Sequence, residues 1–136
     1  MDNLTQTSIG TTIRLNIDFE SALARVTEAL KAEGFGVLTE IDVKETMKRK
    51  LGEEYSPYTI LGACNPHIAH RALQIAPEIG LLLPCNVVVR QLDAEKTEVS
   101  IVNPMDMMGI IGKPELEPVA SEAHERLQRV VKALEA

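Results

Sequence analysis

The sequence is poor in the residues and patterns that mark the more specialised classes of protein. It has no tryptophan, aromatic residues make up 3% of its 136 residues, and it contains only two cysteines. Two cysteines do not build a disulfide framework, and they predict free thiols in the reducing cytoplasm. No apolar stretch approaches the roughly 18 residues of a membrane helix, and residues 1–7 lack the pattern of a signal peptide. We therefore expect a cytoplasmic protein with no membrane partner.

Basic residues are also in the minority. The chain has 14 Lys and Arg against 20 Asp and Glu, which gives a net charge of −6 at pH 7. Proteins that bind nucleic acid usually carry the opposite charge. The one basic run, Lys48-Arg49-Lys50, lies in a short predicted helix, where such charges are usually solvated. We predict that nucleic acid is not a partner.

Familiar enzyme signatures are missing as well. The sequence contains no phosphate-binding P-loop and no G-x-G-x-x-G turn, which argues against nucleotide cofactors. None of the serines stands in the G-x-S-x-G pattern of serine hydrolases. No cofactor is predicted, and the sequence leaves open whether the protein is an enzyme.

The chain does contain enough aliphatic side chains to fill one core. Hydrophobic residues make up 45% of the sequence and charged residues 25%, which excludes disordered and collagen-like chains. A chain of 136 residues has the size of one ordinary globular domain, and two cores of half that size would each be marginal. We predict a single domain over residues 1–136.

Hydrophobic periodicity predicts strands and helices in alternation. The predicted strands cover residues 8–16, 35–41, 58–64, 81–92 and 97–102; the predicted helices cover 19–33, 43–51, 66–76 and the end of the chain from 115 or 118; a loop is predicted over 103–114. Asp18, Asp42 and Asn65 stand at helix starts, and Gly34 and Gly52 stand at helix ends. Helices with one apolar stripe suit a layer on one face of a sheet. The predicted fold class is therefore α+β, a two-layer sandwich in the order β-α-β-α-β-α-β-β-α with a mixed or mainly antiparallel sheet.

Two apolar features favour self-association. The predicted strand 58–64 is apolar on both faces, and such a strand is usually covered on both sides. The predicted loop carries Met105, Met107 and Met108, whose flexible side chains suit an adaptable apolar interface. We expect a homodimer.

Cys64 is the first candidate for chemistry, because it ends a predicted strand directly before the Asn65-Pro66 start of a helix. The free N–H groups and positive dipole of a helix start stabilise a thiolate and attract anions. This placement predicts a pKa below the usual value and a thiol more reactive than Cys85, which shares a face with Val87 and Val89. The alternative is that Cys64 is a small apolar residue packed at a strand end.

The same region offers possible metal ligands. Cys64, His67 and His70 form a C-x-x-H-x-x-H pattern, and Cys85 could join them from the neighbouring strand. Four nitrogen and sulfur ligands would suit Zn²⁺ or Cu⁺, although the spacing matches no standard metal signature. The candidate ligand-binding residues are Cys64, Asn65, His67, His70 and Cys85. Whether the two cysteines are paired, metal-bound or only packed stays open.

Three segments also resemble one protein family. They are residues 34–42 (GFGVLTEID), 58–66 (YTILGACNP) and 82–89 (LLPCNVVV). In this order, their G-F-G-V, C-N-P and L-P-C-N pieces resemble domain-of-unknown-function family 302, over about residues 11 to 108. The resemblance implies a small α+β domain that forms homodimers and has no established activity. It also implies that Cys64 and Cys85 act together, because both positions differ between branches of the family.

Two hypotheses about function remain. The first is a homodimeric ligand-binding or regulatory module with a cleft around Cys64 and Cys85, which takes a small molecule or an anion. The second is a thiol-dependent redox protein or enzyme that uses Cys64, or a protein that binds a soft metal (Cu or Zn). The sequence shows no base and orienting group beside a nucleophile, which favours the first hypothesis.

Overall fold

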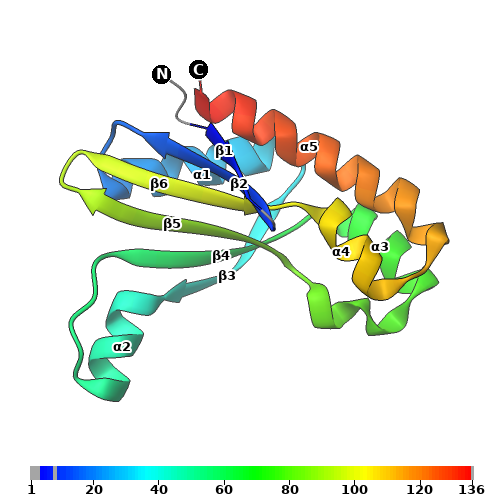
Figure 1. Ribbon diagram of the computed structural model, residues 1–136, viewed down its shortest axis with the longest axis horizontal. Helices are drawn as coiled ribbons and strands as arrows, with labels where there is room; N and C mark the ends of the chain where they lie inside the picture. Colours follow the sequence, from blue (N-terminus) through cyan, green and yellow to red (C-terminus); the bar gives the residue numbers. More distant parts are fainter. Residues whose placement is uncertain (1–3, 8, 136) are drawn as a thin grey trace.

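The computed structural model describes residues 4–7 and 9–135, apart from the side chains at 108 and 109 (Figure 1). Its centre is a six-stranded, fully antiparallel sheet in the order β1-β2-β6-β5-β4-β3. The strands are β1 (Leu4–Gln6), β2 (Gly10–Leu15), β3 (Gly36–Asp42), β4 (Tyr58–Cys64), β5 (Cys85–Asp93) and β6 (Lys96–Val102). The helices are α1 (Phe19–Ala32), α2 (Val43–Leu51), α3 (Pro66–Ile75), α4 (Pro104–Ile111) and α5 (Glu117–Glu135), with two short 3-10 helices, η1 (Pro77–Leu82) and η2 (Pro114–Leu116).

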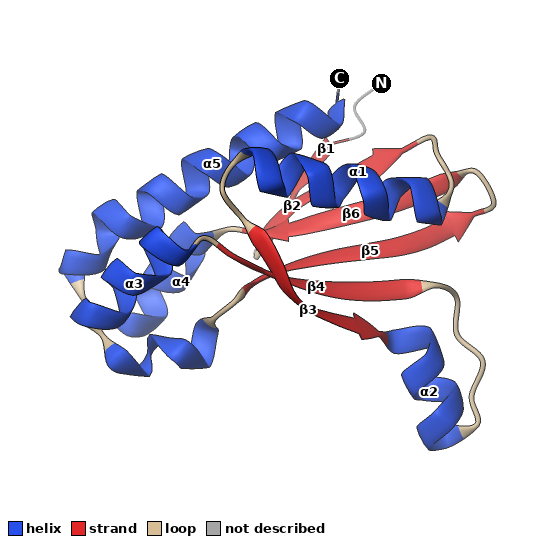
Figure 2. Ribbon diagram, turned by 180° about the vertical axis from the view of Figure 1, so that it is seen from behind, coloured by secondary structure: helices blue, strands red, loops and turns tan. Residues whose placement is uncertain are grey.

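Helices α1 and α5 cover one face of the sheet (Figure 2), so the predicted two-layer α+β class is confirmed. The sheet contributes alternate residues to the main core, among them Ile13, Val99 and Val89, which lie side by side on β2, β6 and β5. Leu30 from α1 and Leu127 from α5 pack against them and are at most 1% exposed. Burial of each such side chain contributes about 1.5–3 kcal/mol, which makes this aliphatic cluster the main stabilising feature.

A second, smaller apolar cluster lies at the end of the sheet, where α3, η1, α4 and the first half of α5 gather. Its buried members are Ile68, Ala72, Ala76, Leu116, Val119 and Ala123. By contrast, α2 stands away from this end, beyond the open edge of the sheet, and buries none of its residues (Figure 1). None of the described helices combines the length and apolar character needed to cross a bilayer.

The local signals in the sequence act as predicted at the helix ends. Asp18 Oδ2 accepts a hydrogen bond from Ser21 N at 3.2 Å, and Asp42 Oδ1 accepts one from Glu45 N at 3.0 Å. Each carboxylate thus satisfies an N–H group that has no partner within its helix. Gly52 ends α2 in the left-handed conformation, with φ 69°, which suits a residue without a Cβ.

The strand predicted over residues 81–92 begins later in the structure than the sequence indicated. Residues 77–82 form η1, and β5 begins only at Cys85, where it pairs with Ala63 near the end of β4. Residue 84 is a proline, which has no N–H group to donate to the ladder, and β4 ends at Cys64, so regular pairing begins at Cys85.

The predicted loop 103–114 is also wrong, because α4 occupies residues 104–111. The Asn103 side chain accepts a hydrogen bond from Met105 N at 2.9 Å. An Asn-Pro pair therefore starts this helix, just as it starts α3. The fold further contains β1, which was not predicted from the sequence, and the helices that pack on β4 lie on one of its faces, in line with the predicted single helical layer.

Candidate functional site

An apolar cavity of about 80 Å³ lies inside the second cluster. Its walls come from α3, η1, α4, α5 and the adjoining ends of β5 and β6. Representative lining residues are Ile68, Ala72, Leu82, Cys85, Met107 and Ala123. No charged side chain lines it among the residues that the structure describes. A space of this kind excludes water and favours an apolar occupant.

Cys85 is the one predicted site residue that lines this cavity. It is the first residue of β5 and continues the face of Val87 and Val89, as the alternation predicts. Burial, together with the nearby Cys64 thiolate, raises the pKa of the Cys85 thiol to about 11. At neutral pH this sulfur is therefore a neutral, weakly polar part of an apolar wall.

Cys64 faces the other side of the sheet, in phase with Tyr58 and Ile60. The predicted lowering of its pKa is wrong, because partial burial raises the pKa of this thiol. The helix start that was expected to stabilise a thiolate is occupied instead by Asn65, whose Oδ1 accepts a hydrogen bond from Ile68 N at 3.2 Å. The same contact takes up an N–H group that an anion would need.

The predicted metal ligands are not brought together. His67 and His70 are exposed on α3, while Cys64 and Cys85 lie on opposite faces of the sheet. Across the described residues, no three His, Cys, Asp or Glu side chains form a group that could hold a metal ion. Alternation along β4 and β5 directs the Cβ atoms of the two cysteines to opposite faces, which disfavours a direct disulfide.

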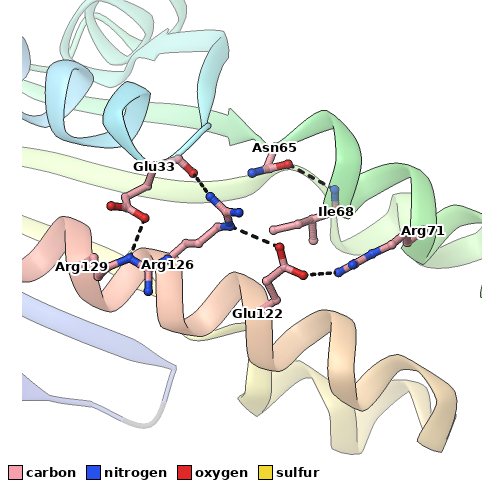
Figure 3. A network of polar contacts seen from close by, with 7 residues as sticks. All are labelled: Glu33, Asn65, Ile68, Arg71, Glu122, Arg126 and Arg129. Atoms are coloured by element: carbon pink, nitrogen blue, oxygen red, sulfur yellow. Dashed lines mark hydrogen bonds and ion pairs between the residues drawn. The ribbon is translucent and has the colours of Figure 1, made fainter.

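A network of polar contacts holds the cavity wall in place (Figure 3). Arg126 of α5 donates from Nη1 to the carbonyl of Glu33 at 3.2 Å and from Nε to Glu122 at 3.3 Å. Arg71 of α3 donates to the other oxygen of Glu122 at 2.7 Å, and it is the main reason that the pKa of Glu122 is lowered. Glu33 also accepts from Arg129 at 2.8 Å. The network thus ties α3, which carries Asn65 and part of the cavity wall, to α1 and α5.

Sequence reasoning missed these residues because their partners are distant in the chain. Arg71 and Glu122, for example, meet only through the packing of α3 on α5. It also missed His124, whose buried Nδ1 has no hydrogen-bond partner within the described part of the chain. His124 directly follows Ala123, a residue of the cavity wall.

The face of the sheet opposite α1 and α5 carries a second notable feature. Glu98 of β6 lies between Arg14 of β2 and Arg90 of β5, and its carboxylate accepts from their Nε atoms at 3.2 and 2.8 Å. The Glu98 side chain is 9% exposed, whereas the arginines are 53% and 46% exposed. The two guanidinium groups therefore shield one carboxylate and leave this row with a net positive charge.

The two thiols are expected to label at different rates. Iodoacetamide should modify Cys64 faster than Cys85, because Cys85 is the more deeply buried and its pKa is raised to about 11. Only the thiolate reacts, so the Cys85 rate should still rise with pH above 10. The measurement is site-resolved mass spectrometry across pH 6–11 on folded protein, with urea-unfolded protein as the control, where both thiols should titrate near 8.5. A Cys64 midpoint below about pH 8 would contradict the structure.

A two-layer α+β protein with an apolar cavity lined by a helical cluster is the class that this fold and site define. Within that class, the chain belongs to one family: the family model described as domain of unknown function DUF302 matches residues 11–134. The chain is also similar to a solved structure, an uncharacterized conserved DUF302 protein from Bacillus stearothermophilus. The two share 30% sequence identity and superpose with a TM-score of 0.84 over 94% of this chain and 99% of the other. A comparison with curated proteins gives no match.

Proposed function

We propose that the protein is a binding module for a small apolar ligand, which occupies the cavity with Cys85 in its wall. The observation that carries this proposal is the apolar lining of a cavity of about 80 Å³. Well-packed interiors rarely leave such a void, and an apolar cavity of about 150 Å³ is known to bind benzene or xenon. Of the other predicted site residues, Asn65 contributes indirectly, because it caps the helix that supplies Ile68 and Ala72. The proposed module is a single-domain protein of the cytoplasm, a reducing compartment in which free thiols such as Cys64 and Cys85 are the rule.

The raised pKa of each thiol argues against the competing thiol-dependent hypothesis. A nucleophilic or redox-active cysteine normally has its pKa lowered by nearby positive charge. Here burial raises the pKa of both Cys64 and Cys85. Cys85 therefore serves the proposed module as an apolar wall residue.

Filling the cavity is expected to abolish ligand binding. Ala123→Leu adds three carbons at a 4% exposed wall position, so xenon or benzene should no longer bind. The matched control is Ala133→Leu on the exposed side of the same helix, which should leave binding unchanged. Binding is measured from ligand-induced shifts in amide NMR spectra, which also report whether each variant is folded. Wild-type spectra that do not change with xenon or benzene would refute the proposal.

We further propose that the protein is a homodimer that pairs through the face of the sheet opposite the helices. Val88, Ile60 and Ile41 are neighbours across β5, β4 and β3 on this face and remain partly or largely exposed. Two copies related by a two-fold axis would bury these side chains against each other.

Light scattering is expected to give twice the chain mass of 14.9 kDa at low micromolar concentration. Ile60→Lys should halve that mass, because it places a charge in the centre of the apolar row. Ala133→Lys, on the helical side of the molecule, should remain dimeric. A wild-type mass equal to that of one chain would rule out the homodimer.

A further inference from the structure

The most exposed apolar side chains of the described residues lie on segments that adjoin the cavity. The three most exposed large apolar side chains of the described residues are Leu81 at 86%, Ile110 at 75% and Ile9 at 73%. Leu81 immediately precedes Leu82, and Ile110 immediately precedes Ile111, both of which line the cavity. The carbonyl of Ile9 accepts from Asn103 N at 3.0 Å, next to the lining residue Pro104.

The cavity also reaches the surface on this side. Its lining residues from η1 and α4, such as Ile79, Leu82 and Met107, are only half-buried, whereas those from α3 and α5 are mostly buried. An apolar ligand that projects beyond about 80 Å³ would therefore continue along the exposed side chains of Leu81 and Ile110. Exposed apolar side chains that adjoin a cavity are typical of ligand-binding sites in other proteins.

The charges next to this surface are nearly all acidic. The segments 77–85 and 102–120 contain four acidic residues and one basic residue, all of them exposed: Glu78, Asp106, Glu115, Glu117 and Lys113. A polar group that emerges from the cavity would therefore meet a negative potential, which favours a positive charge and disfavours a negative one.

We infer that the cavity takes the hydrocarbon end of a single-chain amphiphile with a cationic head group. This inference rests on the proposed function and specifies the class of ligand. The end of the chain fills the cavity, the following methylenes lie on Leu81 and Ile110, and the head group stays in water among the acidic side chains.

The first test compares two probes that share a chain length and differ in charge. Decyltrimethylammonium should bind roughly tenfold more tightly than decanoate at low salt, and the difference should shrink at 1 M salt. In a series of uncharged alkanols, affinity should rise about fourfold per methylene and then level off. Calorimetry is performed below the concentration at which each amphiphile forms micelles.

The second test removes the two exposed apolar side chains beside the cavity, Leu81 and Ile110. The double variant Leu81→Ser/Ile110→Ser should weaken decyltrimethylammonium binding at least tenfold and leave benzene binding intact. Leu51→Ser is the control, because Leu51 is 67% exposed on α2, away from the cavity (Figure 1). Glu78→Gln/Asp106→Asn should reduce the preference for the cationic probe over decanoate.

These outcomes separate the inference from the proposed function. Benzene binding with equal affinity for the two decyl probes would overturn the inference and leave the binding module standing. Loss of all binding, including benzene, would refute the proposed function itself. Decyl binding that competes with dimer formation would show that a second copy covers this surface, and it would also overturn the inference.

Discussion

Truncation of Leu127 to alanine is expected to lower the free energy of unfolding by about 3 kcal/mol, within the 2–5 kcal/mol typical of buried leucines. Leu127 is 1% exposed and packs in the main cluster between α5, α1 and the sheet. The loss has two parts: the transfer free energy of the missing carbons and the cost of the void they leave. Because the neighbouring strands are held on both sides by hydrogen bonds, the void closes only in part. The measurement is urea denaturation followed by circular dichroism.

The matched control for this prediction is Leu51→Ala. Leu51 is 67% exposed at the end of α2, so the same chemical change should cost less than about 0.5 kcal/mol. The dependence of the free energy on urea concentration should be the same for both variants, which shows that the folded and unfolded states are comparable. Equal losses for Leu127→Ala and Leu51→Ala would contradict the core described above.

The features that could be predicted from sequence are those that depend on neighbours along the chain. Asp18, Asp42 and Asn65 cap helices because each side chain reaches an N–H group three residues further on. The hairpin of β5 and β6 follows from two apolar strands around a short polar turn. Alternation also placed Cys85 on the face of Val87 and Val89. Such local signals predict where helices and strands begin and end. The single apolar stripe on each helix then predicts the two-layer class.

The candidate site could not be predicted in the same way, because it is built from segments that are distant in sequence. The cavity needs α3, α4 and α5 to meet at one end of the sheet, and no local pattern states where they meet. The predicted lowering of the Cys64 pKa was wrong for a related reason. A helix start stabilises a thiolate only if its N–H groups are free, and the Asn65 side chain already accepts a hydrogen bond from one of them. The sequence shows that a residue precedes a helix, but tertiary packing decides how far that residue is exposed to solvent and which groups it contacts.

Replacement of Gly10 by alanine is expected to destabilise the protein by about 1–3 kcal/mol, the usual cost of forcing extra atoms into a packed site. Gly10 begins β2 opposite Val102 of β6. A Cβ at this position would collide with the carbonyl oxygen of Ile101 and come within 3.2 Å of the Val102 Cα. Both are backbone atoms of a central strand, so they cannot turn aside as a flexible side chain would.

Gly36→Ala is the matched control and should have the opposite sign. Gly36 also begins a strand, β3, but a Cβ there meets no atom within 4 Å. Alanine restricts the unfolded chain more than glycine does, so this variant should be unchanged or about 0.4–1 kcal/mol more stable. Urea denaturation of the two variants gives both values on one scale. Equal stability of Gly10→Ala and Gly36→Ala would show that β2 and β6 lie further apart at this point than the structure places them, and that the start of β2 tolerates a side chain.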